Sequence, residues 1–190
     1  MCSSDLVRII ALIPSSDALY IPNTLHLFDG ETNDVKGFEI VRHSMDDCAN
    51  FMKLFFNSSL KDYEELSKKD KIAIVRVLLL YVYGGSIGPW DTKPDLMVPH
   101  TWYTVLDQKG VRADLFCTPP RNPILLDYTK DILDNHLRPR RGLASYISKA
   151  AESGTIKPGK NMMDNGWFID ARNTTENFCT TGCCDVPLGF

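Results

Sequence analysis

An isolated acid, Asp91, follows a proline and a tryptophan shortly after an apolar run that ends in a pair of glycines. The stretch reads KIAIVRVLLLYVYGGSIGPWDTKPD and covers residues 71–95. A single carboxylate can hold a divalent cation against a diphosphate, because Mg²⁺ normally uses one or two protein carboxylates and keeps several waters. Asp91 is therefore a candidate metal ligand, and Asp95 is a candidate for the second.

Three neighbouring features have residue types that suit a ligand site. Arg76 carries a guanidinium that pairs with phosphate or carboxylate, the pair Gly84 and Gly85 lets a helix turn sharply into a strand, and Trp90 offers a flat apolar wall. Each also has an ordinary structural interpretation. An arginine can pair with a structural carboxylate, glycines end helices, and an acid such as Asp91 can cap a turn.

The surrounding pattern predicts an α/β domain with a mostly parallel central sheet between flanking helices, an α/β/α sandwich. β-Branched and apolar runs predict strands at 6–14, 38–43 and 114–120, with a short extended segment at 86–91. Apolar spacing predicts helices at 45–56, 71–83, 123–137 and 143–152. Ser44 and Asp47 form a capping-box-like start for the first of these helices, and residues 58–70 are expected to be a polar connector.

The first strands of the sheet are harder to assign from the sequence than the later elements. IPNTLHLF at 21–28 also resembles a strand, but only residues 29–37 separate it from Phe38. A parallel crossover usually needs about a dozen residues or more. We therefore predict that 7–13 pairs with 38–42, and that residues 16–28 cover the sheet as a helix or irregular segment. Ligands bind at the carboxyl ends of such strands, which places Pro14 and Ser15 beside a substrate.

Length, composition and charge limit the classes of protein to which the chain can belong. The 190 residues suit one domain, 1–190, or one module of a longer chain, and 44% apolar with 24% charged residues is ordinary for a globular protein. A net charge of −3 gives no support for nucleic-acid binding. The apolar run 72–83 is too short to span a bilayer, and no signal peptide is evident. With six unevenly spaced cysteines, which do not form a complete zinc-ligand set, a reducing, cytoplasmic location is expected.

VRVLLLYVYGGSIGPWD, residues 75–91, resembles the signature of DxD-containing glycosyltransferases of the GT-A fold, in particular the group of yeast-type α-1,6-mannosyltransferases and clostridial toxin catalytic domains. That signature runs approximately D-x-x-R-x-x-x-L-Y-x-x-G-G-x-Y-x-D-x-D. The matching residues are Arg76, Leu80, Tyr81, Gly84, Gly85 and Asp91. The likeness extends over about residues 7–135, and NPILLDYTKDIL resembles the family's later helix. The departures are Ala73, Ile87 and Pro89, which leave half a DxD motif, PWD.

The resemblance implies a GT-A-like, Rossmann-like sheet and transfer of a sugar from a nucleoside-diphosphate sugar, UDP- or GDP-linked, to a saccharide or glycoprotein acceptor. Residues of about 1–113 would hold the nucleotide, and residues of about 114–190 the sugar and acceptor. Mn²⁺ or Mg²⁺ would bind Asp91 and Asp95. The implied substrate-binding residues are Pro14, Ser15, Arg76, Gly84, Gly85, Trp90 and Asp91. Asp91 and Asp164 would be catalytic, with Asp170 ranked after Asp164.

Two other functions stay open. The first is a catalytically inactive glycosyltransferase-like domain that binds a nucleotide sugar, a glycan or a protein partner. The second is an unrelated hydrolase-like or nucleotidyl-transfer enzyme that uses Asp91 differently. Arginines 138, 140 and 141 could neutralise a diphosphate or lie in a solvated loop, and the four histidines show no spacing typical of a metal or nucleophile site.

Overall fold

The computed structural model describes residues 20–32, 35–90, 93, 96, 101–107, 110–153, 156–160 and 166–170. Its described strands form one seven-stranded sheet in the order β2-β1-β3-β5-β4-β7-β6. In chain order the elements are β1 (Thr24–Phe28), β2 (Glu39–His43), α2 (Met45–Phe55), the short 3-10 helix η1 (Asn57–Ser59), α3 (Leu60–Glu64), α4 (Lys68–Tyr83), β3 (Gly85–Ile87), β4 (Thr101–Asp107), β5 (Gly110–Thr118), α5 (Pro123–Asp134), α6 (Leu143–Glu152), β6 (Ile156–Lys160) and β7 (Gly166–Asp170).

The sheet is mixed, and its parallel part comes from the first half of the chain. β1 lies between β2 and β3 and runs parallel to both, with Leu25 opposite Ile40 on one side and Ser86 on the other. From β3 onward the pairs are antiparallel: β3 with β5, β5 with β4, β4 with β7 and β7 with β6. The predicted α/β class is confirmed, and the predicted parallel arrangement holds among β2, β1 and β3.

The prediction for residues 16–28 is wrong where the structure describes them, because Thr24–Phe28 is strand β1. Its parallel partner is β2, from Thr24 opposite Glu39 to Phe28 opposite His43. The predicted strand 7–13 lies outside the described residues. Within the described residues the strand paired with β2 is β1.

The connection between β1 and β2 returns along the sheet without a helix among its described residues. Gly30 and Gly37 have φ of 88° and 99°, values that suit glycine and allow tight turns at both ends of the connection. Between them Val35 is 6% exposed and packs on the sheet. The described residues of this connection therefore form a loop that packs on the sheet. The minimum length of about a dozen residues applies to a crossover that contains a helix, so it does not apply to this loop.

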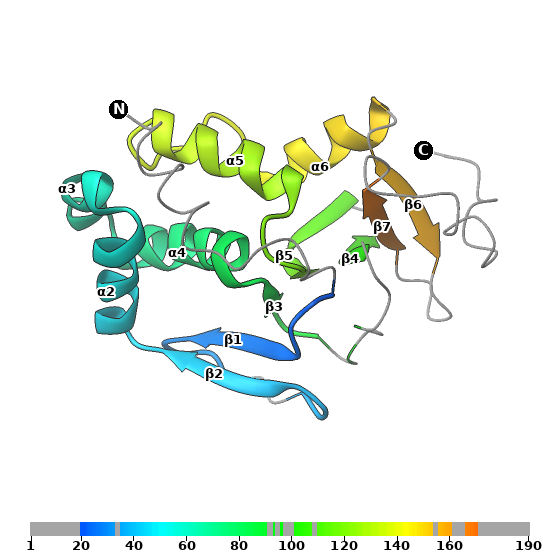
Figure 1. Ribbon diagram of the computed structural model, residues 1–190, viewed down its shortest axis with the longest axis horizontal. Helices are drawn as coiled ribbons and strands as arrows, with labels where there is room; N and C mark the ends of the chain where they lie inside the picture. The colour runs from blue at the N-terminus through cyan, green and yellow to red at the C-terminus, as the bar shows by residue number, and fades with distance from the viewer. Residues whose placement is uncertain are drawn as a thin grey trace.

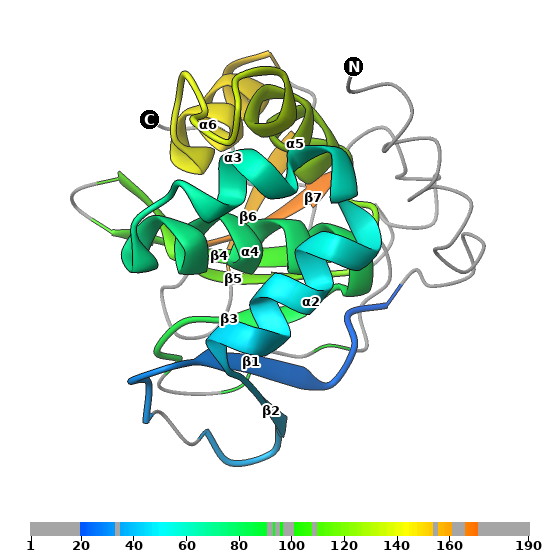
Figure 2. The same ribbon diagram turned by 90° about the vertical axis from the view of Figure 1, so that its left-hand side faces the viewer.

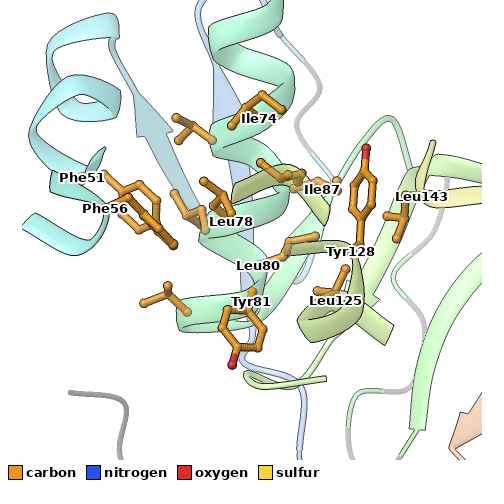
Figure 3. Packing of buried hydrophobic residues seen from close by; sticks show 14 of the residues in the cluster. Phe51, Phe56, Ile74, Leu78, Leu80, Tyr81, Ile87, Leu125, Tyr128 and Leu143 are labelled. Atoms are coloured by element: carbon orange, nitrogen blue, oxygen red, sulfur yellow. The ribbon is translucent and has the colours of Figure 1, made fainter. Parts of the chain in front are cut away.

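The described helices cover one face of the sheet (Figure 1). Figure 2 shows them on one side of the strands, with β2 at the edge of the sheet. Side chains from α2, α4, α5 and α6 meet sheet residues such as Phe28, Ile87 and Phe116 in one apolar core. Figure 3 shows Phe51 of α2, Leu78 of α4 and Leu125 of α5 contributing to this cluster. Burial of this helical layer fixes α4 against the sheet.

The opposite face, called the second face below, has a smaller core made by the sheet and by loops. Trp90 and Leu96, from the segment after β3, are 6% and 5% exposed there. They pack with Leu25 and Leu27 of β1 and with Val35 of the β1–β2 connection. In the described part of the chain this face is covered by loops, so the helical layer of the predicted sandwich is present on one side.

The helix predictions from apolar spacing are confirmed. The capping box at Ser44 and Asp47 starts α2, Pro123 opens α5, and α6 covers the predicted 143–152. The expected polar connector is wrong, because it contains α3, whose Tyr63 is 2% exposed. β4, β6 and β7 were not predicted. No helix in the described part of the chain has the length and apolar character needed to span a bilayer.

Candidate functional site at the carboxyl ends of β1 and β3

The site predicted from sequence would lie where β1 and β3 end side by side. We call this region the β1–β3 edge, defined by residues 29–31 after β1 and residues 88–90 after β3. The first turn of α4 reaches it, since Lys68 Nζ lies 3.4 Å from Asp29 Oδ2. In α/β sheets the carboxyl ends of adjacent parallel strands are the usual place for a ligand.

The glycine pair gives β3 its position between β1 and β5. Gly84 ends α4 with φ 69° and ψ −157°, so it has positive φ but lies outside the left-handed helical region. Gly85 has φ 97°, and a Cβ there would lie 2.8 Å from Nε2 of His26 and 2.9 Å from the carbonyl oxygen of Thr24. Glycine is therefore needed at position 85 for the backbone conformation and for the close approach of β1.

β5 crosses the chain directly after β3. A Cβ at Gly88 would lie 2.0 Å from the carbonyl oxygen of Asp114, so the two backbones are in contact at this point. This contact brings Asp114 to the β1–β3 edge, although no sequence spacing connected it with Asp91. Both carboxylate oxygens of Asp114 accept hydrogen bonds from Arg112, at 2.7 and 2.6 Å. These hydrogen bonds lower the pKa of the Asp114 carboxyl, with smaller favourable effects from the charges of Arg112 and Arg76.

Arg76 projects from α4 to the β1–β3 edge. Its Nη2 donates to Oε1 of Glu31, in an ion pair whose side chains are 22% and 32% exposed. The guanidinium also lies 5.1 Å from the centre of the Phe28 ring. Glu31 Oε2 accepts a hydrogen bond from the backbone N–H of Phe28 at 2.9 Å. Arg76 thus reaches the predicted place, where an internal carboxylate neutralises it.

Trp90 does not present an exposed ring face at this edge. Its indole N–H donates to the carbonyl oxygen of Ile87 at 2.7 Å, and its ring is packed in the second-face core. Lys93, two residues after Asp91, donates to the carbonyl oxygen of Gly37 at 3.0 Å. The described residues on both sides of Asp91 are therefore held by the β3 end and by the β1–β2 connection. A ligand-contacting role for Trp90 stays a prediction.

Two histidines that the sequence did not connect meet beside the glycine pair. Nε2 of His26 lies 3.1 Å from the carbonyl oxygen of Gly84, and Nδ1 lies 3.0 Å from Nε2 of His43. A carbonyl can only accept, so we assign the hydrogen of neutral His26 to Nε2, which makes its Nδ1 the acceptor for His43. Burial lowers the pKa of His26 to about 4, helped by the nearby His43. His26 thus ties β1 to the α4–β3 turn.

This network makes stability depend on pH. Because the folded pKa of His26 is about 4 and the ordinary value is 6.5, the unfolded chain binds the proton first as pH falls. The free energy of unfolding should therefore decrease by about 3 kcal/mol between pH 6.5 and pH 4 through this residue. Burial also lowers the pKa of His43, which faces Asp47, and adds a contribution of the same sign.

Urea unfolding of the wild type, His26→Gln and His136→Gln across pH 4–7 measures this contribution. His26→Gln should flatten the pH dependence, whereas His136→Gln, at a histidine whose side chain is 80% exposed, serves as the matched control. An unchanged slope in His26→Gln would contradict the assignment.

Several predicted site residues lie outside the described residues: Pro14, Ser15, Asp91, Asp95 and Asp164. Asp170 ends β7, and β4 and β5 separate β7 from β3 in the sheet. Arg140 donates from Nε to Oδ1 of Asn135 at 2.9 Å and belongs to the turn after α5. The structure places Arg76 with Glu31 and Asp114 at the β1–β3 edge. It places Gly84 and Gly85 with His26 at the opposite, amino end of β3.

The described acids at this edge do not form a metal site. Glu31 and Asp114 are each held by an arginine, and Asp29 lies 3.4 Å from Lys68. Among the described residues no group of three or more possible ligands could hold a metal ion. The metal-binding role of Asp91 and Asp95 stays a prediction, because both residues lie outside the described part of the chain.

Among known proteins the whole chain is weakly similar to a solved structure. No protein-family model matches the chain, and no curated protein matches it. A similar solved structure is described as PaToxG glycosyltransferase. It has a TM-score of 0.47 and 13% sequence identity, covering 80% of this chain and 76% of that one. At this TM-score the likeness lends no weight to any particular site or activity.

Proposed function

We propose that this chain is a GT-A-type glycosyltransferase that moves a sugar from a UDP- or GDP-linked donor to a saccharide or glycoprotein acceptor. The observation that carries the proposal is the position of Arg76 beside Glu31 at the carboxyl end of β1, on a helix that leads through Gly84 and Gly85 into β3. These three residues match one signature in the sequence. Asp91 directly follows Trp90, which is fixed by hydrogen bonds to Ile87 and Gly88.

In this proposal Arg76 binds the donor diphosphate. A phosphate oxygen would compete with Glu31 for the guanidinium, and such charge-assisted hydrogen bonds are stronger than neutral ones. Phe28, stacked under the guanidinium, limits where that group can move. Mn²⁺ or Mg²⁺ bound by Asp91 and Asp95 would supply Lewis-acid stabilisation of the leaving diphosphate. The resemblance implies retention, with the leaving phosphate taking the acceptor's proton.

A second candidate is a non-catalytic relative that binds a nucleotide sugar, a glycan or a protein. It is favoured by Pro89, which replaces the first acid of the DxD motif. It is also favoured by the internal partners of Glu31 and Asp114, since these acids are already neutralised. Such a protein would bind donor without releasing diphosphate.

A donor-hydrolysis panel tests the proposal. The purified protein is incubated with UDP-glucose, UDP-N-acetylglucosamine, UDP-galactose and GDP-mannose, with and without Mn²⁺, and released nucleoside diphosphate is measured. The proposal expects release from at least one donor. Binding without release, seen as a rise in melting temperature with UDP or GDP, would support a non-catalytic relative that binds a nucleotide sugar. No binding and no release would overturn the glycosyltransferase proposal and leave a relative that binds a glycan or a protein.

A further inference from the structure

A second site lies on the other side of α4, in a pocket of about 380 Å³. We call it the α4–α5 pocket. It is bounded by the α3–α4 turn, the first half of α4, Tyr128 of α5 and the turn that follows α5. Its volume lies in the range of roughly 300–1,000 Å³ that is usual for small-molecule sites. Neither the glycosyltransferase signature nor the β1–β3 edge includes it.

The turn after α5 is built in a strained conformation that fixes one wall of this pocket. His136 and Leu137 have φ of 52° and 60°, in the left-handed region that costs about 1–2 kcal/mol for each residue other than glycine. The turn is held by the buried Leu137, whose N–H donates to the carbonyl oxygen of Ile132 at 2.8 Å. Nδ1 of His136 lies 2.9 Å from Asp62 of α3. Strain of this kind is often found at functional sites.

This turn places the exposed Arg138 in the lining of the pocket. The Arg138 side chain has no hydrogen bond or ion pair to the described residues, and its backbone N–H is held by the carbonyl oxygen of Asn135 at 2.9 Å. The lining also includes Glu65 and Asp70, and the Asp70 carboxylate accepts from the Ser67 hydroxyl at 2.6 Å. The lining residues therefore include a hydrogen-bond donor from the turn after α5 and acceptors from the α3–α4 turn and α4.

The lining of the pocket also has an apolar part. Tyr128, Leu137 and Pro139 contribute rings and aliphatic surface, and Figure 3 shows the Tyr128 hydroxyl pointing away from Leu125. Ala73 lines the pocket with a small side chain, which keeps the space beside α4 open. Two carboxylates with one guanidinium disfavour a strongly charged ligand of either sign. A neutral molecule with apolar C–H faces and many hydroxyls matches this lining.

The pocket and the β1–β3 edge share one wall. α4 directs Lys68 and Arg76 to the β1–β3 edge, while Ser67, Asp70 and Ala73 face the pocket. A helix with its side chains is about 10–12 Å across. A ligand of two or more sugar units could therefore occupy the pocket and extend around the start of α4 toward the edge.

We propose that the α4–α5 pocket binds the saccharide part of the acceptor, at a distance from the hydroxyl that reacts. The inference rests on the proposed function, since it treats the β1–β3 edge as the donor site. Arg138 and the carboxylates of Glu65 and Asp70 hold sugar hydroxyls, and Tyr128 with Pro139 packs on the C–H face.

Saccharide and nucleotide binding are measured separately in one set of variants. Maltose, lactose and α-1,6-mannobiose are titrated into the full chain by calorimetry, and UDP and GDP with Mn²⁺ are titrated in parallel. Arg138→Met removes the guanidinium and keeps the aliphatic stem, and Ala73→Leu fills the pocket with a good helix former. Arg141→Met and Ser148→Leu, at exposed positions near the same turn and on α6, are the matched controls.

At least one disaccharide should bind the wild type and both controls, and bind Arg138→Met and Ala73→Leu about tenfold to a hundredfold more weakly. Nucleotide affinity should be the same in all five proteins. Absence of saccharide binding in the wild type, or equal binding in variants and controls, would overturn the pocket even if nucleotides bind. Saccharide binding lost in the pocket variants but with no nucleotide bound by any protein would overturn the acceptor role and the proposed function, and leave a saccharide-binding pocket.

Discussion

Gly85→Ala is expected to lower the free energy of unfolding by about 2–5 kcal/mol. A φ of 97° costs a residue with a Cβ roughly 1–2 kcal/mol. The added methyl would also meet His26 Nε2 at 2.8 Å and the Thr24 carbonyl oxygen at 2.9 Å, and overpacking of this kind costs about 1–3 kcal/mol more. Chemical denaturation followed by circular dichroism measures the loss.

Two other glycines separate these contributions. Gly30 has a similar φ of 88° with no atom near its Cβ position, so Gly30→Ala should cost only the roughly 1–2 kcal/mol of backbone strain. Gly142 has open space and no positive φ in that region, and Gly142→Ala should change stability by less than about 0.5 kcal/mol. Equal losses for Gly85→Ala and Gly30→Ala would show that β1 does not press on the α4–β3 turn.

Arg76→Met is expected to weaken nucleoside-diphosphate binding about tenfold to a hundredfold while lowering stability by less than about 1 kcal/mol. The affinity loss follows from removal of a charge-assisted hydrogen bond to phosphate. The small stability loss follows from the exposure of the Arg76–Glu31 pair, 22% and 32%, since partly exposed ion pairs contribute little. Calorimetric titration with UDP and GDP in the presence of Mn²⁺ gives the affinity, and urea unfolding gives the stability.

Glu31→Gln provides the matched comparison. It breaks the same ion pair but keeps the guanidinium, so nucleotide affinity should be unchanged or higher as Arg76 becomes available to phosphate. If both variants lose stability and the folded fraction keeps its nucleotide affinity, Arg76 serves to hold the loop after β1 and does not bind the ligand.

The sequence predicts the helical layer well because each helix carries its own signal. The spacing of Cys48, Phe51 and Met52 already marks the buried face of α2, and Pro123 marks the start of α5. The first strand was misassigned for a physical reason. The β1–β2 connection replaces the expected helix with a loop that turns at Gly30 and Gly37, and the sequence does not show how that loop packs.

Some residues of the candidate site could likewise be predicted from the sequence, and others could not. Arg76 and the glycine pair are found from sequence because they lie within one contiguous stretch that runs from α4 into β3. His26 and His43 meet only through the parallel register of β1 and β2, and Asp114 reaches the edge only because β5 runs antiparallel to β3. Correct assignment of β1 would have placed the two histidines on neighbouring strands, and no local signal would have identified Asp114.

The claim that the β1–β3 edge holds a diphosphate is tested most directly by titrating UDP and GDP into the wild type and Asp91→Asn, each with Mn²⁺ and with excess chelator. Mn²⁺ should strengthen nucleotide binding to the wild type by tenfold or more, as several kcal/mol of metal–phosphate interaction allows. Asp91→Asn, which keeps the size of the side chain, should remove this dependence with the melting temperature unchanged. Equal Mn²⁺ dependence in both proteins, or no nucleotide binding by the wild type, would contradict this claim.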